Sequence, residues 1–176
     1  MSINQSEVKK ELERFAKVVK KEARTALTKQ DRNVSKELYN SIKYDVEVYK
    51  NSFHLSFYMK DYGKFQDQGV KGKSSSARAP QSEFKFGSGT GKKGGLTTGI
   101  FEWVKARRFQ FRDKKSGRFM SFKSTAFLIS RSIYHKGLKP TKFFSKPFEK
   151  AFTRLSDDLV KAYGLEVNKL LSDIVV

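Results

Sequence analysis

The apolar residues of this chain change from a helical to a strand spacing within its first sixty residues, and this change restricts the fold more than any other feature. Five apolar residues of "SEVKKELERFAKVVKKEARTAL" recur every three or four positions, namely Val8, Leu12, Phe15, Val19 and Ala23. This spacing predicts an amphipathic helix with one buried face. We expect Ser6 to be its N-cap, because a serine oxygen can accept a hydrogen bond from a free N–H group of the first turn.

The segment that follows has the period of a β-strand. In "KYDVEVYKNSFHLSFYM", apolar and polar residues alternate on both sides of a "KNS" turn, which predicts a β-hairpin with one buried face. Just before it, "SKELYNSI" places Leu38 and Ile42 on one face of a short helical turn. His54 falls on the polar face of the hairpin, so we expect it to be solvated rather than catalytic.

Between Gly63 and Gly99 the periodicity disappears. Nine of the twelve glycines lie in this stretch, together with several serines and Pro80. A long segment without a pattern is usually a functional or disordered loop, so we expect a flexible Gly/Ser/Lys-rich loop over 63–99. The length of 176 residues suits one domain, so we expect residues 1–176 to form a single domain that contains this loop.

Helical spacing returns after the loop. "TTGIFEWVKARRF" predicts a helix that is capped by Thr97 or Thr98 and has Trp103 on its apolar side. "STAFLISRSIYHKG" predicts another, which Gly137 would end in a left-handed conformation, with His135 at the negative end of the helix dipole. Between the two helices, "QFRDKKSGRFMSF" predicts a basic hairpin around "KKSG".

The last part of the chain is predicted to be a linker and a helix. Two prolines make "LKPTKFFSKPF" an expected extended linker, and Gly164 would kink or split the helix after it. Seven apolar residues mark that long terminal helix: Phe148, Phe152, Leu155, Leu159, Ala162, Leu170 and Ile174. The expected fold class is therefore α+β, with an antiparallel sheet packed against several α-helices, a long C-terminal helix and a long Gly/Ser-rich loop.

The net charge indicates a polyanionic partner. Lys and Arg number 37 against 18 Asp and Glu, a formal charge of +19, and such a surplus favours nucleic acid. Residues 105–123 alone carry eight Lys and Arg against one acid, interleaved with Phe109, Phe111 and Phe119. Aromatic rings between cations suit stacking on single-stranded bases, but we favour a place in the core of the hairpin for these three.

No enzyme motif fits well. "FKFGSGTGKKGG" fails as a phosphate-binding loop, because Phe86 stands where a glycine is required and Lys93 replaces the hydroxyl residue. Asp67 with Glu83 and Lys85 loosely resembles the carboxylates and lysine of a metal-dependent nuclease, which stays a minor alternative. With no cysteine and two histidines, we expect no structural zinc, no catalytic residue and no cofactor, while a carboxylate-bound magnesium remains open. No apolar run is long enough to span a membrane, and no secretory signal opens the chain.

Three segments in order resemble the neck and tail-completion proteins of tailed bacteriophages. "SKELYNSI" matches their Thr-Gly-x-Leu-x-x-Ser-Ile segment at Ser35, Leu38, Ser41 and Ile42, although Lys36 replaces the usual glycine. "YGKFQDQGVKG" is similar to their Tyr-x-x-aromatic-x-acid-x-Gly stretch, with matches at Tyr62, Phe65, Asp67 and Gly69. "GLKPTKFFSKPF" is similar to their closing stretch, with matches at Gly137, Pro140, Phe143, Pro147 and Phe148.

The resemblance implies a structural virion protein without catalytic activity. Such proteins form a homo-oligomeric ring, six- or twelvefold, between the portal or adaptor and the tail proteins. Double-stranded genomic DNA passes through the lumen of the ring, and no membrane is involved. The expected location is the neck of the virion, after assembly in the host cytoplasm. A free DNA- or RNA-binding protein remains the main alternative.

The resemblance and the charge together indicate two sets of site residues. The expected subunit contacts are Tyr62, Phe65, Gln66, Gly69, Val70, Lys71, Phe143, Phe144, Pro147 and Phe148, with packing inside the protomer as the alternative. The expected DNA-lumen residues are Arg107, Arg108, Arg112, Lys114, Lys115, Arg118, Lys92 and Lys93.

Overall fold

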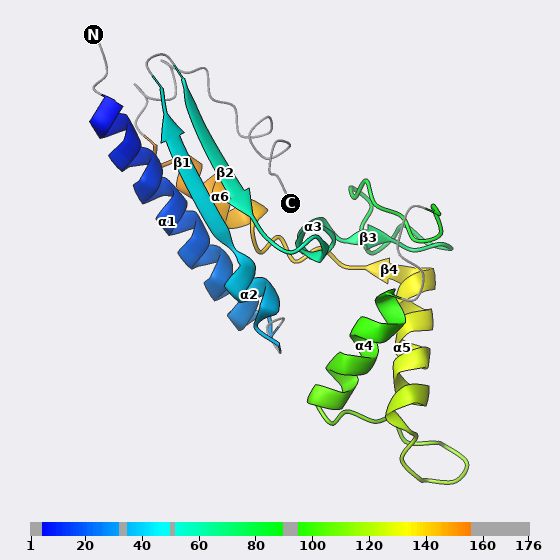
Figure 1. The fold of residues 1–176 in the computed structure, drawn as a ribbon. Helices are drawn as coiled ribbons and strands as arrows, with labels where there is room; N and C mark the ends of the chain where they lie inside the picture. Colours follow the sequence, from blue (N-terminus) through cyan, green and yellow to red (C-terminus); the bar gives the residue numbers. More distant parts are fainter. Residues whose placement is uncertain (1–4, 32–34, 50–51, 90–94, 156–176) are drawn as a thin grey trace. The chain divides into compact units, whose positions relative to one another are not determined.

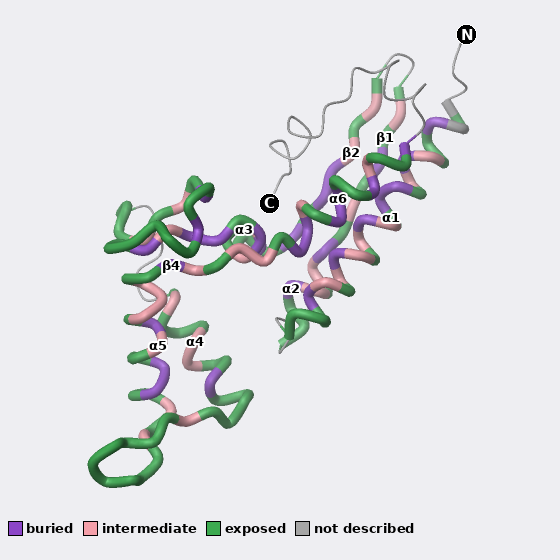
Figure 2. Tube along the Cα trace, turned by 180° about the vertical axis from the view of Figure 1, so that it is seen from behind, coloured by how far each residue is buried: buried purple, intermediate pink, exposed green. Residues whose placement is uncertain are grey.

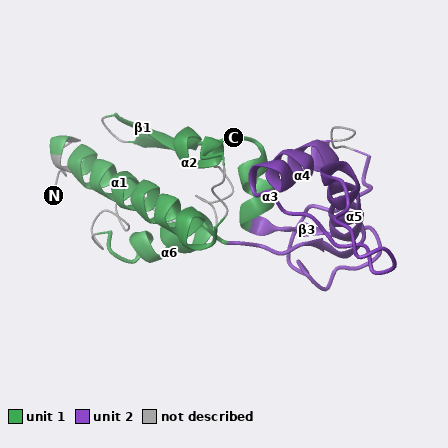
Figure 3. Ribbon diagram, turned by 90° about the horizontal axis from the view of Figure 1, so that it is seen from below, with its two compact units in different colours: residues 1–67, 142–176 green, residues 68–141 purple. Residues whose placement is uncertain are grey.

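A computed structural model describes residues 5–31, 35–49, 52–89 and 95–155 of the chain. The fold is α+β, as predicted, with six helices and two small antiparallel sheets among these residues. The chain divides into two compact units, one formed by residues 1–67 and 142–176 and the other by residues 68–141 (Figure 3). We call them the terminal unit and the inserted unit, because the second is inserted into the sequence of the first.

The terminal unit is built on helix α1 and a β-hairpin. The predicted amphipathic helix is α1, Gln5–Lys29, and the predicted hairpin is β1, Lys43–Val48, paired antiparallel with β2, Phe53–Tyr58 (Figure 1). The register runs from Lys43 opposite Tyr58 to Val48 opposite Phe53. The short predicted helical turn is α2, Glu37–Ser41, and two further helices follow as α3, Tyr62–Gln68, and α6, Ser145–Phe152.

One hydrophobic core joins these elements. The buried stripe of α1, visible in purple in Figure 2, packs against the alternating apolar face of the hairpin and against α6. Aromatic rings link the layers: Phe148 of α6 lies 5.2 Å from Phe15 of α1 and 6.1 Å from Phe57 of β2, measured between ring centroids. Both α1 and α6 therefore pack against the apolar face of the hairpin.

The inserted unit consists of two helices, a minimal sheet and loops. Its elements are β3, Val70–Lys71, α4, Gly95–Ala106, α5, Phe122–Lys136, and β4, Gly137–Leu138. β3 and β4 pair antiparallel, and α4 packs against α5. Ser121 caps α5, since its side chain accepts a hydrogen bond from the Ser124 N–H at 3.1 Å.

Several boundaries differ from the sequence predictions at the ends of helices. Ser6 is not an N-cap, because the backbone is already helical at Gln5. Thr97 and Thr98 likewise lie inside α4, which begins at Gly95. The "SKPF" half of the predicted extended linker is the first turn of α6, where proline is tolerated because the N–H groups of a first turn have no partner within the helix.

Gly137 ends α5 as predicted, but not in a left-handed helical conformation. Its φ of 90° is positive while its ψ of 169° is extended, so the chain leaves the helix directly into β4. The predicted basic hairpin is reduced to one bridge, between Arg112 and Phe119. The predicted long terminal helix is shorter where the structure describes it: α6 ends at Phe152, and Leu155 lies in the turn after it. Leu159, Ala162, Gly164, Leu170 and Ile174 lie outside the described residues.

The stretch predicted as one long loop contains regular structure at both ends, namely α3 with β3 and the start of α4. Its described middle, residues 72–89, is irregular but hydrogen-bonded to its own unit. The Lys71 N–H donates to Phe84 O at 2.8 Å, and the Phe86 N–H donates to Lys71 O at 2.9 Å. The Lys73 N–H donates to Tyr134 O at 2.8 Å. The segment therefore runs along β3 and the end of α5.

Candidate interaction surface

The positive charge is concentrated in the inserted unit. Its 74 residues hold seventeen Lys and Arg against three Asp and Glu, a net charge of +14, whereas the 102 residues of the terminal unit have a net charge of +5. A field of one sign over so short a segment favours an anionic partner. The functional surface is therefore expected on the inserted unit.

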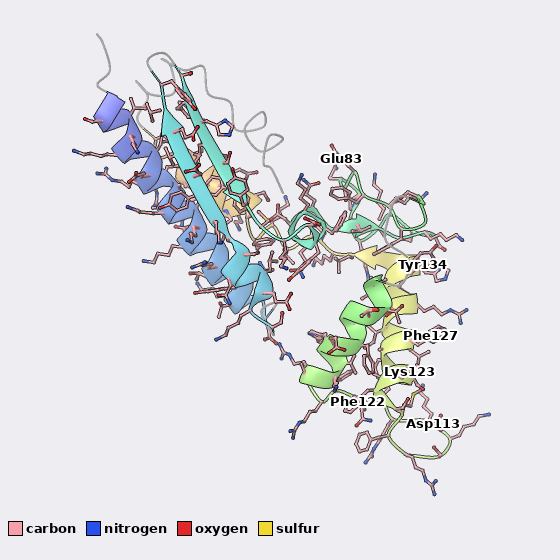
Figure 4. The ribbon with its side chains drawn as sticks, viewed as in Figure 1. Glu83, Asp113, Phe122, Lys123, Phe127 and Tyr134 are labelled. Atoms are coloured by element: carbon pink, nitrogen blue, oxygen red, sulfur yellow. The ribbon has the colours of Figure 1, made fainter. Side chains whose placement is uncertain are left out.

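The inserted unit buries few of its large apolar side chains. Among its described residues, the buried apolar side chains are Val70, Ala79, Val104 and Ala126. Six large ones are exposed on α4, α5 and the loop between them: Trp103, Phe109, Phe111, Phe119, Phe127 and Leu128. Two packed helices bury only the stripe between them, so apolar residues elsewhere on the pair need a third layer. Figure 4 shows Phe127 and Lys123 projecting from α5.

We call these six side chains, with the exposed cations Arg107, Arg108, Arg112, Lys114, Lys115 and Arg118, the basic aromatic surface. Three of its rings form a continuous row, because Phe109 lies 6.2 Å from Trp103 and 5.3 Å from Phe111, measured between centroids. The Arg112 guanidinium lies 5.1 Å from the centroid of the Phe119 ring. One cation of the surface thus lies against the face of one of its rings.

Hydrogen bonds hold the loop that carries this surface. The Gln110 side-chain amide donates to Met120 O at 2.7 Å, and the Met120 N–H donates to Phe111 O at 2.8 Å. At the tip, Asp113 Oδ1 accepts from the Ser116 N–H at 2.7 Å, the Ser116 hydroxyl at 2.9 Å and the Lys115 N–H at 3.0 Å (Figure 4). These bonds, those from Ser116 above all, lower the pKa of Asp113. Asp113, the one acidic residue of residues 105–123, thus forms hydrogen bonds within its own turn.

The prediction that Phe109, Phe111 and Phe119 form a hairpin core is wrong. Their exposed fractions are 41%, 37% and 64%, because the loop closes through a single bridge and has no second layer above it. The predicted lumen cations that the structure describes are all exposed, and Lys92 and Lys93 lie outside the described residues. Sequence reasoning missed Trp103, Phe127 and Leu128, which helical spacing assigned to buried faces or left unassigned.

The residues predicted as subunit contacts differ in how far they are buried. Phe143, Phe144, Pro147 and Phe148 are buried in the terminal unit, where the Phe144 and Phe57 ring centroids are 5.2 Å apart. Gly69 and Val70 are buried in the inserted unit, and Gln66 and Lys71 are half-buried. Tyr62 and Phe65 are exposed. In the protomer, then, the phenylalanines of the closing segment pack internally.

Asp67 of α3 forms hydrogen bonds with residues 142–145 inside the terminal unit. Its Oδ1 accepts hydrogen bonds from the N–H groups of Phe144 at 2.7 Å and Ser145 at 3.2 Å, and its carbonyl accepts from the Lys142 N–H at 3.0 Å. Burial raises the pKa of Asp67 despite these bonds. The residue therefore caps α6 at the point where the chain leaves the terminal unit and returns to it. Glu83 of the nuclease alternative is exposed in the inserted unit.

Glycines at the start of β3 and the end of α5 permit a close approach within the inserted unit. A Cβ at Gly69, whose φ is +74°, would lie 2.6 Å from Leu138 O and 2.7 Å from Pro140 N. A Cβ at Gly137, whose φ is +90°, would lie 2.5 Å from Val70 O. The second and third segments of the resemblance therefore meet in both units, through β3–β4 in one and through Asp67 in the other.

No family model, no curated protein and no solved structure matches this chain. Within the described ranges, no group of three or more His, Cys, Asp and Glu side chains could hold a metal ion. In the same part of the chain, no helix has the length and apolar character needed to cross a bilayer.

Proposed function

We propose that this chain is a structural protein of the tailed-phage neck. In this proposal it is one protomer of a homo-oligomeric ring that joins the portal or adaptor to the tail proteins around the DNA channel. The observation that carries the proposal is the basic aromatic surface, in which Trp103, Phe109 and Phe111 form an exposed row of rings on a unit of net charge +14. Adjoining exposed aromatic rings favour a surface that a partner covers on assembly.

The backbone supports the resemblance on which the proposal rests. Lys36 stands where the resembling proteins have glycine, and its φ is +55°, a left-handed value that favours glycine. The glycine positions of the other two segments, Gly69 and Gly137, also have positive φ values of 74° and 90°. Positive φ at all three positions, two of which hold glycine here, is what the resembling pattern predicts.

In this function the two components of the surface have separate roles. The exposed rings dock on a neighbouring protein of the neck, because burying aromatic area contributes the largest share of interface energy. The lysines and arginines of the loop face the DNA, where they contact phosphates without reading sequence. In this proposal the oligomeric ring is structural and needs no cofactor.

The decisive experiment quantifies tryptic peptides of this protein in purified virus particles from its source, relative to the portal protein. A fixed ratio of one-half or one identifies a ring component and indicates its symmetry. Absence of the protein from particles would refute the proposal.

The row of rings from Trp103 to Phe111 favours a second candidate function, a free single-strand-binding protein. Stacked bases would quench the fluorescence of Trp103, the one tryptophan of the chain. A single-stranded oligonucleotide that quenches Trp103 in the isolated protomer, with an affinity that falls steeply as salt rises, would favour this candidate over the neck protein.

A further inference from the structure

A second basic site lies on the terminal unit. A surface hollow of about 420 Å³ opens along α1. It is lined by four cations of this helix, Lys17, Lys20, Lys21 and Arg24, and by Tyr39 and Tyr44. No acidic side chain lines this hollow. None of these residues belongs to the basic aromatic surface.

The cations of this hollow repel one another. Burial and the neighbouring charges of Arg24 and Lys43 lower the pKa of Lys20, and no carboxylate offsets them. Lys17 has an ion pair with Glu13 at 3.8 Å, but both side chains are exposed, where such a pair contributes little. An anion in the hollow would relieve this repulsion.

The fold holds two of the cations in place. Arg24 Nε donates to Tyr39 O at 2.9 Å and its Nη2 donates to Ile42 O at 3.3 Å, while the guanidinium lies 4.8 Å from the centroid of the Tyr39 ring. The Lys20 ammonium lies 5.6 Å from the centroid of the Tyr44 ring. Positioned cations lose less conformational freedom when a ligand binds.

The spacing of the cations favours a ligand that carries several negative charges in a row. Lys17 with Lys21, and Lys20 with Arg24, are pairs four residues apart, so each pair projects from one face of the helix. From Lys17 to Arg24 the helix rises about 10 Å, at roughly 1.5 Å per residue. One strand of B-DNA advances about 3.4 Å per phosphate along its axis, so the length of this row corresponds to about three phosphate-to-phosphate steps. A single carboxylate would leave most of the row without a partner.

We propose that this hollow binds the phosphodiester backbone of duplex DNA, as a contact separate from the basic aromatic surface. The contact is electrostatic and independent of sequence, because lysines act as point charges toward phosphates. It does not depend on the proposed place of the protein in a virion.

The test compares two charge-matched double variants of the full chain, which differ only in their position on α1. Lys20→Gln with Lys21→Gln removes two cations from the hollow, and Lys9→Gln with Lys10→Gln removes two exposed cations from another part of the same helix. Affinity for a fluorescent 20-base-pair duplex is measured by anisotropy between 50 and 300 mM salt. The first variant is expected to lower the slope of log affinity against log salt by about 1–2, and the second by less than about 0.5.

Equal losses in the two variants would overturn the proposal, because the effect would then be one of overall charge. Unlabelled duplex and polyglutamate are also compared as competitors of the fluorescent duplex. If polyglutamate displaces it at the same concentration of negative charge as unlabelled duplex does, the proposal is overturned too. If the hollow variant fails to fold, as far-UV circular dichroism would reveal, NMR of the wild-type protein replaces it. A 12-base-pair duplex is then expected to shift the amides of residues 17–25, and unshifted amides there would refute the site.

Discussion

Asp67 is predicted to be a main determinant of the stability of the terminal unit. In Asp67→Ala the Phe144 N–H, which is buried, and the Ser145 N–H, which is partly buried, lose their acceptor. An unpaired buried donor costs about 1–3 kcal/mol and a lost helix cap about 0.5–2 kcal/mol. Because the two descriptions overlap, we expect a loss of about 2–4 kcal/mol in the free energy of unfolding, a large fraction of the stability of a typical domain.

Asp67→Asn is the matched control for this prediction. Its amide oxygen can still accept both N–H groups, and no charge is buried, so we expect it to stay within about 1 kcal/mol of the wild type at pH 7. Both variants are measured by urea unfolding followed by circular dichroism at 222 nm, which reports the helices of both units together. Trp103 fluorescence reports the inserted unit separately. The reasoning is refuted if Asp67→Ala costs less than about 1 kcal/mol, or if Asp67→Asn costs as much as Asp67→Ala.

The difference in the free energy of unfolding between the wild type and Asp67→Asn should change with pH in a defined direction. The folded-state pKa of Asp67 is raised above its ordinary value of 3.8, so the folded protein binds more protons than the unfolded chain between 3.8 and the raised pKa. The contribution of Asp67 to stability is therefore greatest below 3.8 and is lost as pH rises through the raised pKa. Relative to Asp67→Asn, the wild type should lose stability on going from pH 3 to pH 7. A difference that grows in favour of the wild type would contradict the assignment.

Three further predictions use the same urea-unfolding measurement. Lys36→Gly should stabilise the terminal unit by about 0.5–1 kcal/mol, because φ is +55° there, and a loss of stability would count against the left-handed backbone. Gly69→Ala should cost more than about 2 kcal/mol, since its Cβ would lie 2.6 Å from Leu138 O. A Cβ at Gly99 would have no other atom within 4 Å, so Gly99→Ala should raise the stability of α4 by up to about 1 kcal/mol. Similar effects at both glycines would contradict the close packing at Gly69. Phe148→Ala should cost about 3–5 kcal/mol because its ring is 3% exposed, whereas Phe119→Ala, at 64% exposed, should stay within about 0.5 kcal/mol, and equal costs would refute their assignment to core and surface.

Periodicity predicted the terminal unit well because its pattern is local. The apolar stripe of α1 and the alternation of the hairpin each follow from a few neighbouring residues, and the structure confirms both. The basic character of residues 105–123 was also evident from composition alone, since charge needs no fold to be counted. The ends of helices were predicted less well, because Ser6, Thr97 and Thr98 are possible caps by residue type and yet lie inside helices.

The burial of the phenylalanines depended on tertiary structure. Phe144 and Phe119 have the same side chain and similar basic neighbours, yet Phe144 is 2% exposed and Phe119 is 64% exposed. Helix α1 and the hairpin cover the first, whereas α4 and α5 have no further layer to cover the second. The sequence records the size of a side chain but not what will lie above it.

The sequence by itself determined the α+β class, the period of each main element and the amount of charge. Only the tertiary structure decided that Asp67 caps a helix that begins 78 residues later and that the cations of α1 line a hollow. The physical reason is range: periodicity and charge belong to neighbouring residues, whereas caps, hollows and covered surfaces arise when distant segments come into contact.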